Sequence, residues 1–330
     1  MESIYDHLPR MKPSGEILKD GKTDWVKSKL KSIAVSKAFK TDNKYWLGRS
    51  ERMFECGSTL KFAHNNSGER RLIEANFCKD RMCPACQKRR SLVVFHQVKN
   101  VCTAIALDYP TYKYVLLTLT VPNVPIADLS SKIGEMAKAW KRLTLRKEFM
   151  KSIKGWFRTL EVTYNADRDD YHPHYHILLC VPSGYFKKTY ITHPRWLELW
   201  QHAMRDDSIT QVDIRTIKPN PKKEGSDAIS SAAAEVGKYA TKPSDYVLKL
   251  PTKDRYYAVP KIVQDLAEGI SKRKLIAFGG IMLEYSKKLD LQDVDSDSVD
   301  LINTDGDSDQ VNAVATQIFR WNIGFSNYVC

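Results

Sequence analysis

Residues 156–181 contain the side-chain pattern with the clearest chemistry, a histidine pair in a strand-like segment. His174 and His176 lie in HYHILLCV, and alternate side chains of a strand point to the same face. Two imidazoles on one face can bind one metal ion, and a neighbouring carboxylate shifts the preference towards manganese or magnesium. A His-x-His motif with nothing near it is more often a pair of ordinary histidines, so the prediction depends on what lies opposite.

A hairpin supplies the carboxylate. The runs GWFRTLEVTY and HYHILLCV flank NADRDD, whose residues are typical of a hairpin loop. If the hairpin is centred on this loop, Glu161 lies directly opposite His174, and directly paired residues share a face. We therefore expect Glu161, His174 and His176 to hold a metal ion. His172 has the same parity and is either a fourth ligand or a phosphate contact.

A second reactive pair lies on the Ala-rich segment SDAISSAAAEVGKYATK. Glu235 and Tyr239 are four residues apart and share one helix face. A phenolate can attack as a nucleophile while a carboxylate transfers a proton. A tyrosine with the ordinary pKa of about 10 needs activation, which a nearby metal or Lys238 could supply. Taken alone, this pair is more typical of a surface contact.

Four of the seven cysteines have the spacing of a metal site. Cys78, Cys83 and Cys86 are spaced much as in structural zinc sites, and Cys56 upstream is the natural fourth ligand, with His64 as the alternative. Thiols of a cytosolic protein are metal ligands or free before they are disulfides. The cluster therefore predicts a structural Zn²⁺, and reduced structural thiols are the alternative.

The chain is basic, with 52 Lys and Arg against 39 acidic residues and a net charge of +13. Eight aspartates and no basic residue lie between Asp290 and Asp309, so the rest of the chain carries +21. Such a surplus favours nucleic acid or an anionic membrane surface as a partner. The acidic stretch resembles a calcium loop only superficially, since Ser298 stands where that loop requires glycine. We expect a solvated loop there.

Basic residues concentrate on a helix expected over 128–153. Eight basic residues and one acid lie between Lys138 and Arg158, and such a one-signed face suits phosphate better than protein, although a solvated helix face is the alternative. The DNA contacts expected on this helix and the Ala-rich one are Lys138, Lys141, Arg142, Arg146, Lys238 and Lys242.

The pattern of elements predicts an α+β fold. It gives strands over 112–121, 156–164, 174–181 and 211–217, with helices between them. Other helices are expected over 24–37, 85–107, 226–242 and 253–268, with a hairpin within 53–77 and strands near 275–284 and 318–321.

Four segments together resemble a known family. LTLTVPN (117–123), HPHYHILL (172–179) and EVGKYATK (235–242) resemble, in this order, the three motifs of plasmid rolling-circle replication initiators in the HUH endonuclease superfamily. FCKDRMCPACQKRR (77–90) is similar to the cysteine segment of an initiator subfamily with a single catalytic tyrosine. The resemblance covers roughly residues 54–250. It implies the HUH endonuclease fold, which is a central antiparallel sheet with packed helices, together with a zinc-stapled N-terminal module.

The resemblance also implies an activity and residue roles. Tyr239 would attack the scissile phosphate of one strand at the plasmid origin, leaving a 5′-phosphotyrosyl link and a 3′-hydroxyl that primes synthesis. His174 and His176 would hold Mg²⁺ or Mn²⁺, with Glu161 as candidate third ligand. Glu235 matches the family glutamate that activates water at termination.

Other functions remain open from the sequence. A mobilisation relaxase or a single-tyrosine transposase shares this chemistry, and a non-catalytic zinc-dependent DNA-binding regulator would use the histidines as a second structural site. An RNA-binding protein fits the charge, but nothing in the sequence resembles a single-strand stacking module.

The expected organisation has three regions. They are an N-terminal helical and zinc-binding module over 1–108, a catalytic domain over 109–250 and a C-terminal region over 251–330 with an origin-recognition role. Expected partners are plasmid origin DNA, single-stranded at the nick, with a host helicase and polymerase. The longest apolar run, 114–121, is far shorter than the roughly 20 residues of a membrane span, and the first residues lack a secretory signal. A cytoplasmic protein is expected, and its oligomeric state does not follow from the sequence.

Overall fold

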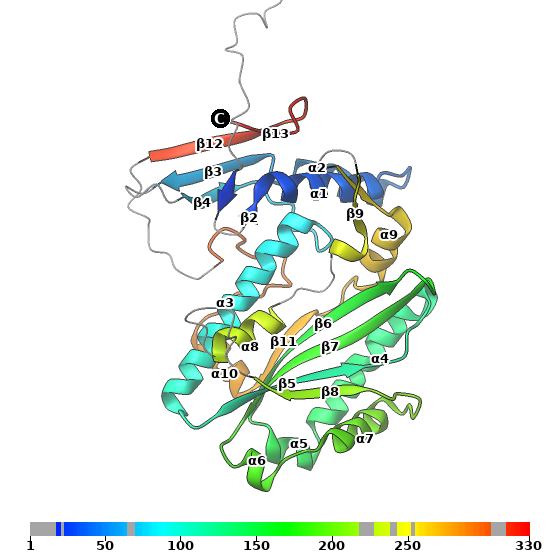
Figure 1. Ribbon diagram of the computed structural model, residues 1–330, viewed down its shortest axis with the longest axis vertical. Coiled ribbons are helices and arrows are strands. Elements are labelled where there is room, and N and C mark those ends of the chain that lie inside the picture. The colour runs from blue at the N-terminus through cyan, green and yellow to red at the C-terminus, as the bar shows by residue number, and fades with distance from the viewer. Residues whose placement is uncertain are drawn as a thin grey trace, which may run out of the picture. The chain divides into compact units, whose positions relative to one another are not determined.

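The structure is a computed structural model that describes residues 18–20, 23–64, 70–217, 228–237, 243–251, 255–304 and 315–330 (Figure 1). Its contacts divide the chain into two units. The first comprises Met1–Cys86, Val247–Ala258 and Asp307–Cys330, and the second comprises Gln87–Tyr246 and Val259–Gly306. Residues 251–330, expected as one region, are thus distributed over both units.

The first unit combines helices with a four-stranded antiparallel sheet of order β13-β12-β3-β4. Trp25 of its first helix packs against Phe62 of the sheet, with ring centroids 6.4 Å apart. The elements of this unit are β1 (Lys19–Asp20), β2 (Thr23–Asp24), α1 (Trp25–Ala38), α2 (Lys44–Glu55), β3 (Thr59–His64), β4 (Arg70–Ala75), β9 (Val247–Lys249), β10 (Tyr256–Ala258), β12 (Ala315–Asn322) and β13 (Asn327–Val329). The expected first helix, the hairpin within 53–77 and the strand near 318–321 are confirmed.

The second unit is built on a five-stranded sheet of order β11-β6-β7-β5-β8, in which every neighbouring pair is antiparallel. α3 (Pro84–Asp108) begins in the first unit and continues in this one. The other elements are β5 (Lys113–Thr120), α4 (Ile126–Thr144), α5 (Lys147–Ser152), β6 (Gly155–Asn165), β7 (Asp170–Val181), α6 (Tyr185–Lys188), α7 (His193–Met204), β8 (Val212–Thr216), α8 (Ala228–Val236), the 3-10 turn η1 (Pro243–Asp245), α9 (Pro260–Gly269), β11 (Ile276–Gly280) and α10 (Ile281–Lys288). The expected α+β class and the four core strands are confirmed.

One face of this sheet forms an aromatic core. Trp140 of α4 contacts the rings of Trp156 and Tyr175 at centroid distances of 5.0 and 6.4 Å, and Tyr175 also contacts Trp200 of α7. Because side chains alternate along a strand, His174 and His176 must lie on the other face. The sheet is therefore anchored from one side, and its second face carries the polar groups.

The helix expected over 128–153 is two helices. α4 ends at Thr144, and Arg146 has an extended backbone (φ −70°, ψ 138°) before α5 begins. The break brings Phe149 into edge contact with the rings of Trp140 and Trp196, at 5.8 and 6.1 Å. Burial of this aromatic ring outweighs continuation of the helix.

Two expected elements near the C-terminus also differ. Residues 256–258 pair with β9 as a strand, and the helix expected from 253 starts at Pro260, where proline suits the first turn. The strand expected to 284 ends at Gly280, which has φ +56° and lies so close to the Lys154 carbonyl that a Cβ would approach it to 2.3 Å. α10 follows directly.

In its described part, 290–304, the acidic segment is solvated at most of its aspartates, as expected, but it is packed at its apolar side chains and at one aspartate. Val294 and Val299 have exposed fractions of 0% and 1%. Asp295 is also buried, and its carboxylate accepts hydrogen bonds from the backbone N–H groups of Leu275 and Ile276 at 2.7 and 3.2 Å. This carboxylate satisfies donors at the start of β11.

Two arginines of α3 hold the same segment. Arg89 donates to the carbonyls of Leu301 and Ile302 at 2.7 and 2.6 Å, and the buried Arg90 donates to the carbonyl of Val294. Since both guanidinium groups are committed to backbone carbonyls, they do not add to a DNA-facing charge.

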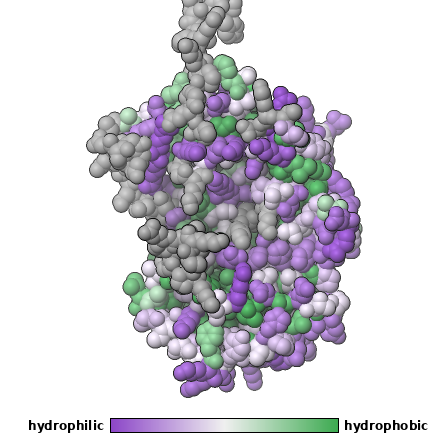
Figure 2. All heavy atoms as spheres, in the orientation of Figure 1, coloured by the Kyte–Doolittle hydropathy of each residue, from purple (hydrophilic) through white to green (hydrophobic). Residues whose placement is uncertain are grey.

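Hydrophilic residues dominate the face shown in Figure 2, and hydrophobic residues lie among them in small groups. In the described part of the chain, no helix is both long and apolar enough to cross a membrane.

Candidate functional site

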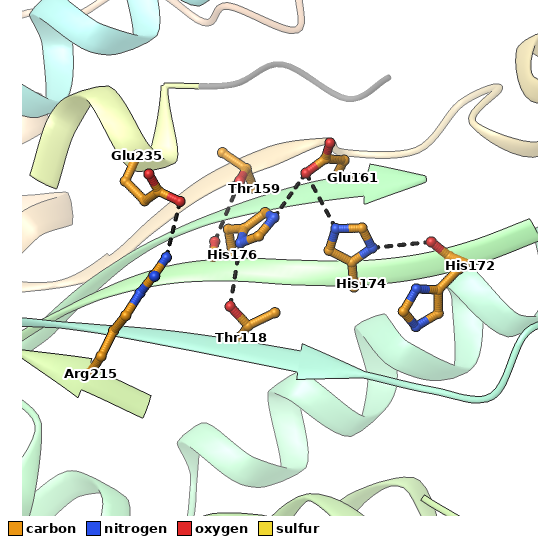
Figure 3. A network of polar contacts seen from close by, with 8 residues as sticks. All are labelled: Thr118, Thr159, Glu161, His172, His174, His176, Arg215 and Glu235. Carbon is orange, nitrogen blue, oxygen red and sulfur yellow. Dashed lines mark hydrogen bonds and ion pairs between the residues drawn. The ribbon is translucent and has the colours of Figure 1, made fainter. Parts of the chain in front are cut away.

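The metal-binding group predicted from the sequence is assembled by strand register. β6 pairs with β7 so that Glu161 lies opposite His174 and Thr159 opposite His176, which confirms the predicted pairing. The next strand, β5, places Thr118 opposite His176, so that Thr159, His176 and Thr118 form one row across three strands. Figure 3 shows these side chains together on one face of the sheet.

The two imidazoles converge on one carboxylate oxygen. The Nε2 atoms of His174 and His176 lie 3.2 and 2.8 Å from Oε2 of Glu161. Glu161 has an exposed fraction of 3% and His174 one of 8%. The ligand atoms of all three residues lie within 4.8 Å of one another. A buried carboxylate held against two imidazoles is a compact set of three ligands.

Hydrogen bonds favour the tautomer that a metal ligand needs. Nδ1 of His174 lies 3.1 Å from the carbonyl oxygen of His172, which can only accept, so Nδ1 carries the proton. Nε2, the other ring nitrogen, is then the one that faces Glu161 and is placed to act as a metal ligand. Nδ1 of His176 lies 3.4 Å from the hydroxyl of Thr118. Metal-ligating histidines are usually oriented in this way through their second nitrogen.

The separations fit a small divalent cation. Ligand atoms at about 2.1 Å from an octahedral ion are about 3.0 Å apart when adjacent, and the observed nitrogen–oxygen separations are 2.8 and 3.2 Å. Residues Glu161, His174 and His176 would hold such an ion on one side, leaving the side away from the sheet for other ligands.

His172 lies beside this group without joining it. Its ring centroid is 5.2 Å from that of His174, and the three-membered ligand set does not include it. Burial lowers the pKa of His172, and the neighbouring His174 lowers it further. A neutral ring carries no charge that would attract a phosphate. His172 therefore fits better as a ring neighbour of the metal group than as a phosphate contact.

The far end of the hairpin is fastened to α9. The hydroxyl of Tyr171 donates to Asp265 at 2.6 Å, and burial together with this bond raises the pKa of Tyr171. Lys261 donates to Asp265 and to Asp169, both at 3.0 Å, and these bonds raise its pKa. The hairpin is thus held by α9 at its tip and by β5 along its length.

Glu235 lies on α8, on the same side of the sheet as the histidines (Figure 3). Its Oε1 accepts a hydrogen bond from Arg215 of β8 at 3.1 Å. Arg215 is a residue that sequence reasoning missed, although its strand parity, the same as that of Asp213 opposite Thr118, would have placed it on this face. Lys238, Tyr239 and Lys242 lie outside the described residues.

The other predicted DNA contacts are on the opposite side of the sheet. Lys138, Lys141 and Arg142 belong to α4, which packs on the aromatic face. Arg142 donates to the carbonyl of Ala203 at 2.8 and 2.6 Å and so anchors the end of α7. Arg146 forms the N-cap of α5. A DNA role for these four residues stays a prediction.

The cysteine cluster belongs to the first unit. Cys56, Cys78, Cys83 and Cys86 form one group of sulfur ligands within 4.8 Å, so Cys56 rather than His64 completes it. Sulfur separations are 3.5 Å for Cys56–Cys86, 3.6 Å for Cys56–Cys83 and 3.7 Å for Cys78–Cys86. Four sulfurs at about 2.3 Å from a tetrahedral Zn²⁺ are about 3.8 Å apart, which fits closely.

Neighbouring groups stabilise negative sulfur there. Ser32 lies 3.3 Å from Sγ of Cys83, and the backbone N–H of Cys78 points to Sγ of Cys56 at 3.4 Å. Burial alone would raise the pKa of Cys83, but hydrogen bonds from the other three thiols and Ser32 bring it well below its usual value. The thiolate form is thus favoured at Cys83, whereas hydrogen bonds raise the pKa of Cys78 and burial raises that of Cys86, both well above the usual value.

Comparison with known proteins agrees with the arrangement of these groups. The replication protein family profile matches residues 69–329. The chain belongs to the Rep family of replication proteins. It is 32% identical over 312 residues to the Rep protein of Streptococcus pneumoniae serotype 2, covering 92% of this chain and 91% of that one.

Other Rep proteins are similarly related. The chain is 33% identical to that of Bacillus amyloliquefaciens over 93% of its length and 94% of the relative. It is 31% identical to that of Lentilactobacillus hilgardii over 96% of its length and 99% of the relative. No solved structure matches.

The histidine–glutamate group predicts a measurable affinity for Mn²⁺. Glu161→Gln should weaken Mn²⁺ binding by at least about tenfold, because the amide removes the anionic ligand while preserving its shape. Calorimetric titration of the full chain measures this directly. Asp213→Asn is the matched control. Asp213 also has an acidic side chain on this face of the sheet, in the cross-strand row of His176 and Thr118, but it is not part of the ligand group. Equal affinities of wild type and Glu161→Gln would contradict the assignment.

Proposed function

We propose that this Rep protein initiates rolling-circle replication of a plasmid by nicking one strand of its origin. The observation that carries the proposal is the Glu161, His174 and His176 group, which shares a sheet face with α8. Tyr239 follows the end of α8 by three residues. Membership of the Rep family supports the replication role.

In this proposal each residue has a distinct task. The three metal ligands would hold Mg²⁺ or Mn²⁺, which supplies Lewis-acid polarisation of the scissile phosphate. The Tyr239 oxygen forms a bond to phosphorus while the bond from phosphorus to the 3′ oxygen breaks. The phenolic proton passes to solvent, and the departing 3′ oxygen takes up a proton from solvent to end as the hydroxyl that primes synthesis. The phosphodiester energy is kept in the 5′-phosphotyrosyl link.

Glu235 would act at termination. Its carboxylate takes a proton from water, whose oxygen attacks the phosphorus of the second cleavage site. The bond from that phosphorus to the 3′ oxygen breaks, and the 3′ oxygen takes up a proton and leaves as a hydroxyl. The hydrogen bond from Arg215 supports this role because it orients the carboxylate over the sheet face. Hydrolysis discards the bond energy and so ends the cycle.

The cysteine cluster would bind a structural Zn²⁺ through Cys56, Cys78, Cys83 and Cys86, in support of the first unit. Origin DNA, single-stranded at the nick, would be the substrate, and a host helicase and polymerase would extend the primer. The protein would work in the cytoplasm with its plasmid.

The nucleophile assignment is tested with Tyr239→Phe on an origin-derived single-stranded oligonucleotide. The variant should bind this DNA normally, whereas the covalent adduct on a denaturing gel should fall by at least about a thousandfold, because phenylalanine has no nucleophilic oxygen. Tyr246→Phe is the control, since Tyr246 is fully buried and accepts a hydrogen bond from Gln87 at 3.2 Å. An undiminished adduct in Tyr239→Phe would refute the assignment.

The termination role is tested with Glu235→Gln. Formation of the first adduct should be unchanged, while hydrolysis at a second site should slow by about 10²–10⁴-fold through loss of the general base. A substrate with two nick sites separates the two steps. Glu148→Gln is the control, because Glu148 is paired with Arg195 at 2.8 Å on the other side of the sheet. Normal release by Glu235→Gln would exclude this role.

The zinc proposal is tested by metal analysis of purified protein. Cys86→Ala should lose about one equivalent of zinc and lower the melting temperature, because three sulfurs no longer close a tetrahedral site. Cys180→Ala removes an equally buried thiol outside the cluster and should keep its zinc. A full zinc complement in Cys86→Ala would argue against the cluster.

A further inference from the structure

A second feature of the catalytic unit lies at the free edge of its sheet. β8 is the edge strand, and a pocket of about 260 Å³ opens beside it. This volume is below the roughly 300–1,000 Å³ of pockets for drug-sized ligands, so it suits a single planar ring system. The pocket is lined by Val115, Phe186, Tyr190, Ile214, Arg215 and Thr216.

Two of the lining residues are aromatic and unusually exposed. The exposed fractions of Phe186 and Tyr190 are 39% and 50%. Their ring centroids are 6.2 Å apart with an interplanar angle of 29°. The buried Tyr185 contacts both rings edge-on, at 5.1 and 5.6 Å. The pair is therefore held in place before any ligand arrives.

The charge around the pocket is positive. Arg215 is the charged residue among the six that line it, and Lys187 and Lys188 are exposed on the same short helix, α6, as Phe186. Exposed aromatic faces next to cations are what single-stranded nucleic acid requires, since bases stack on rings and phosphates meet charges. An apolar peptide segment would offer no anionic groups to pair with these three cations.

Arg215 connects the pocket with the candidate active site. Its guanidinium donates to Glu235, and Arg215 is also one of the residues that line the pocket. Arg215 lies two residues along and two strands across from His176. Sheet spacings put their Cα atoms about 12 Å apart. Strand alternation places Val115, Ile214 and Thr216 on the aromatic face, so a nucleic-acid strand that leaves the metal group would reach the pocket by passing over the β8 edge at Arg215.

We propose that the pocket beside β8 binds one unpaired base of the nicked strand, stacked on Phe186 and Tyr190 with its phosphate near Arg215. The proposal rests on the proposed nicking function for its substrate and adds a base-binding position to it. Contact of the same strand with Arg215 would couple occupancy of the pocket to the orientation of Glu235.

The test is binding of fluorescein-labelled single-stranded dT12, without added divalent metal, by the intact protein. The double variant Phe186→Leu/Tyr190→Leu keeps the pocket apolar but removes both stacking faces, so dT12 affinity should fall about 5- to 150-fold. The control is Tyr109→Leu/Tyr112→Leu, which removes another stacked aromatic pair of this unit, with centroids 4.8 Å apart. It should bind dT12 as the wild type does.

Photocrosslinking locates the base independently. A dT12 with one 5-iodouracil should crosslink to the peptide containing residues 185–191. Unchanged affinity of the Phe186→Leu/Tyr190→Leu variant, with crosslinks elsewhere, would overturn the proposal. So would a variant that binds dT12 normally but no longer self-associates, because the patch would then be a protein interface. Wild type that binds dT12 through this pocket yet never cleaves origin DNA would refute the nuclease and leave the pocket standing.

Discussion

The pairing of β6 with β7 is the constraint on which the candidate site depends. Side chains alternate in a strand, so a slip of one residue would send Glu161 to the aromatic face, away from the histidines. Several contacts prevent that slip. The side chain of Asn165 accepts hydrogen bonds from the backbone N–H groups of Asp167 and Arg168 in the turn. Tyr171 donates a hydrogen bond to Asp265, and β5 pairs with the second strand from His174 to Val181.

The two faces of the sheet have different roles, one in packing and one in presenting polar groups. The face under α4, α5 and α7 is filled with tryptophan and other aromatic rings, and it supplies the burial that holds the strands in place. The other face can then carry a buried carboxylate and two imidazoles, which would otherwise be costly to bury. Rigid support of this kind is what a metal site needs, since its ligands must keep their positions when the ion or substrate leaves.

Several charged side chains stabilise the fold through hydrogen bonds to the backbone. Arg89, Arg90 and Arg142 contribute to the basic composition, yet each donates to backbone carbonyls within the protein. Asp295 likewise accepts hydrogen bonds from two backbone N–H groups. The net charge of the chain counts these internally bonded residues together with the charged residues that face solvent. The cations that we propose for contact with DNA lie instead at the edge of the sheet near Arg215, outside the basic run of residues 138–158.

The sequence by itself determined the features that depend on local spacing. Strand alternation and a loop centre were enough to pair Glu161 with His174. Cysteine spacing predicted the cluster of Cys78, Cys83 and Cys86, with Cys56 or His64 as the fourth ligand. The sequence also predicted the antiparallel sheet and the Rep family. Only the tertiary structure decided contacts between segments distant in sequence: the choice of Cys56, the break at Arg146, the packing of Val294 and Val299, the pairing of Arg215 with Glu235 and the pocket at Phe186. These depend on which surfaces meet, and periodicity within one segment does not carry that information.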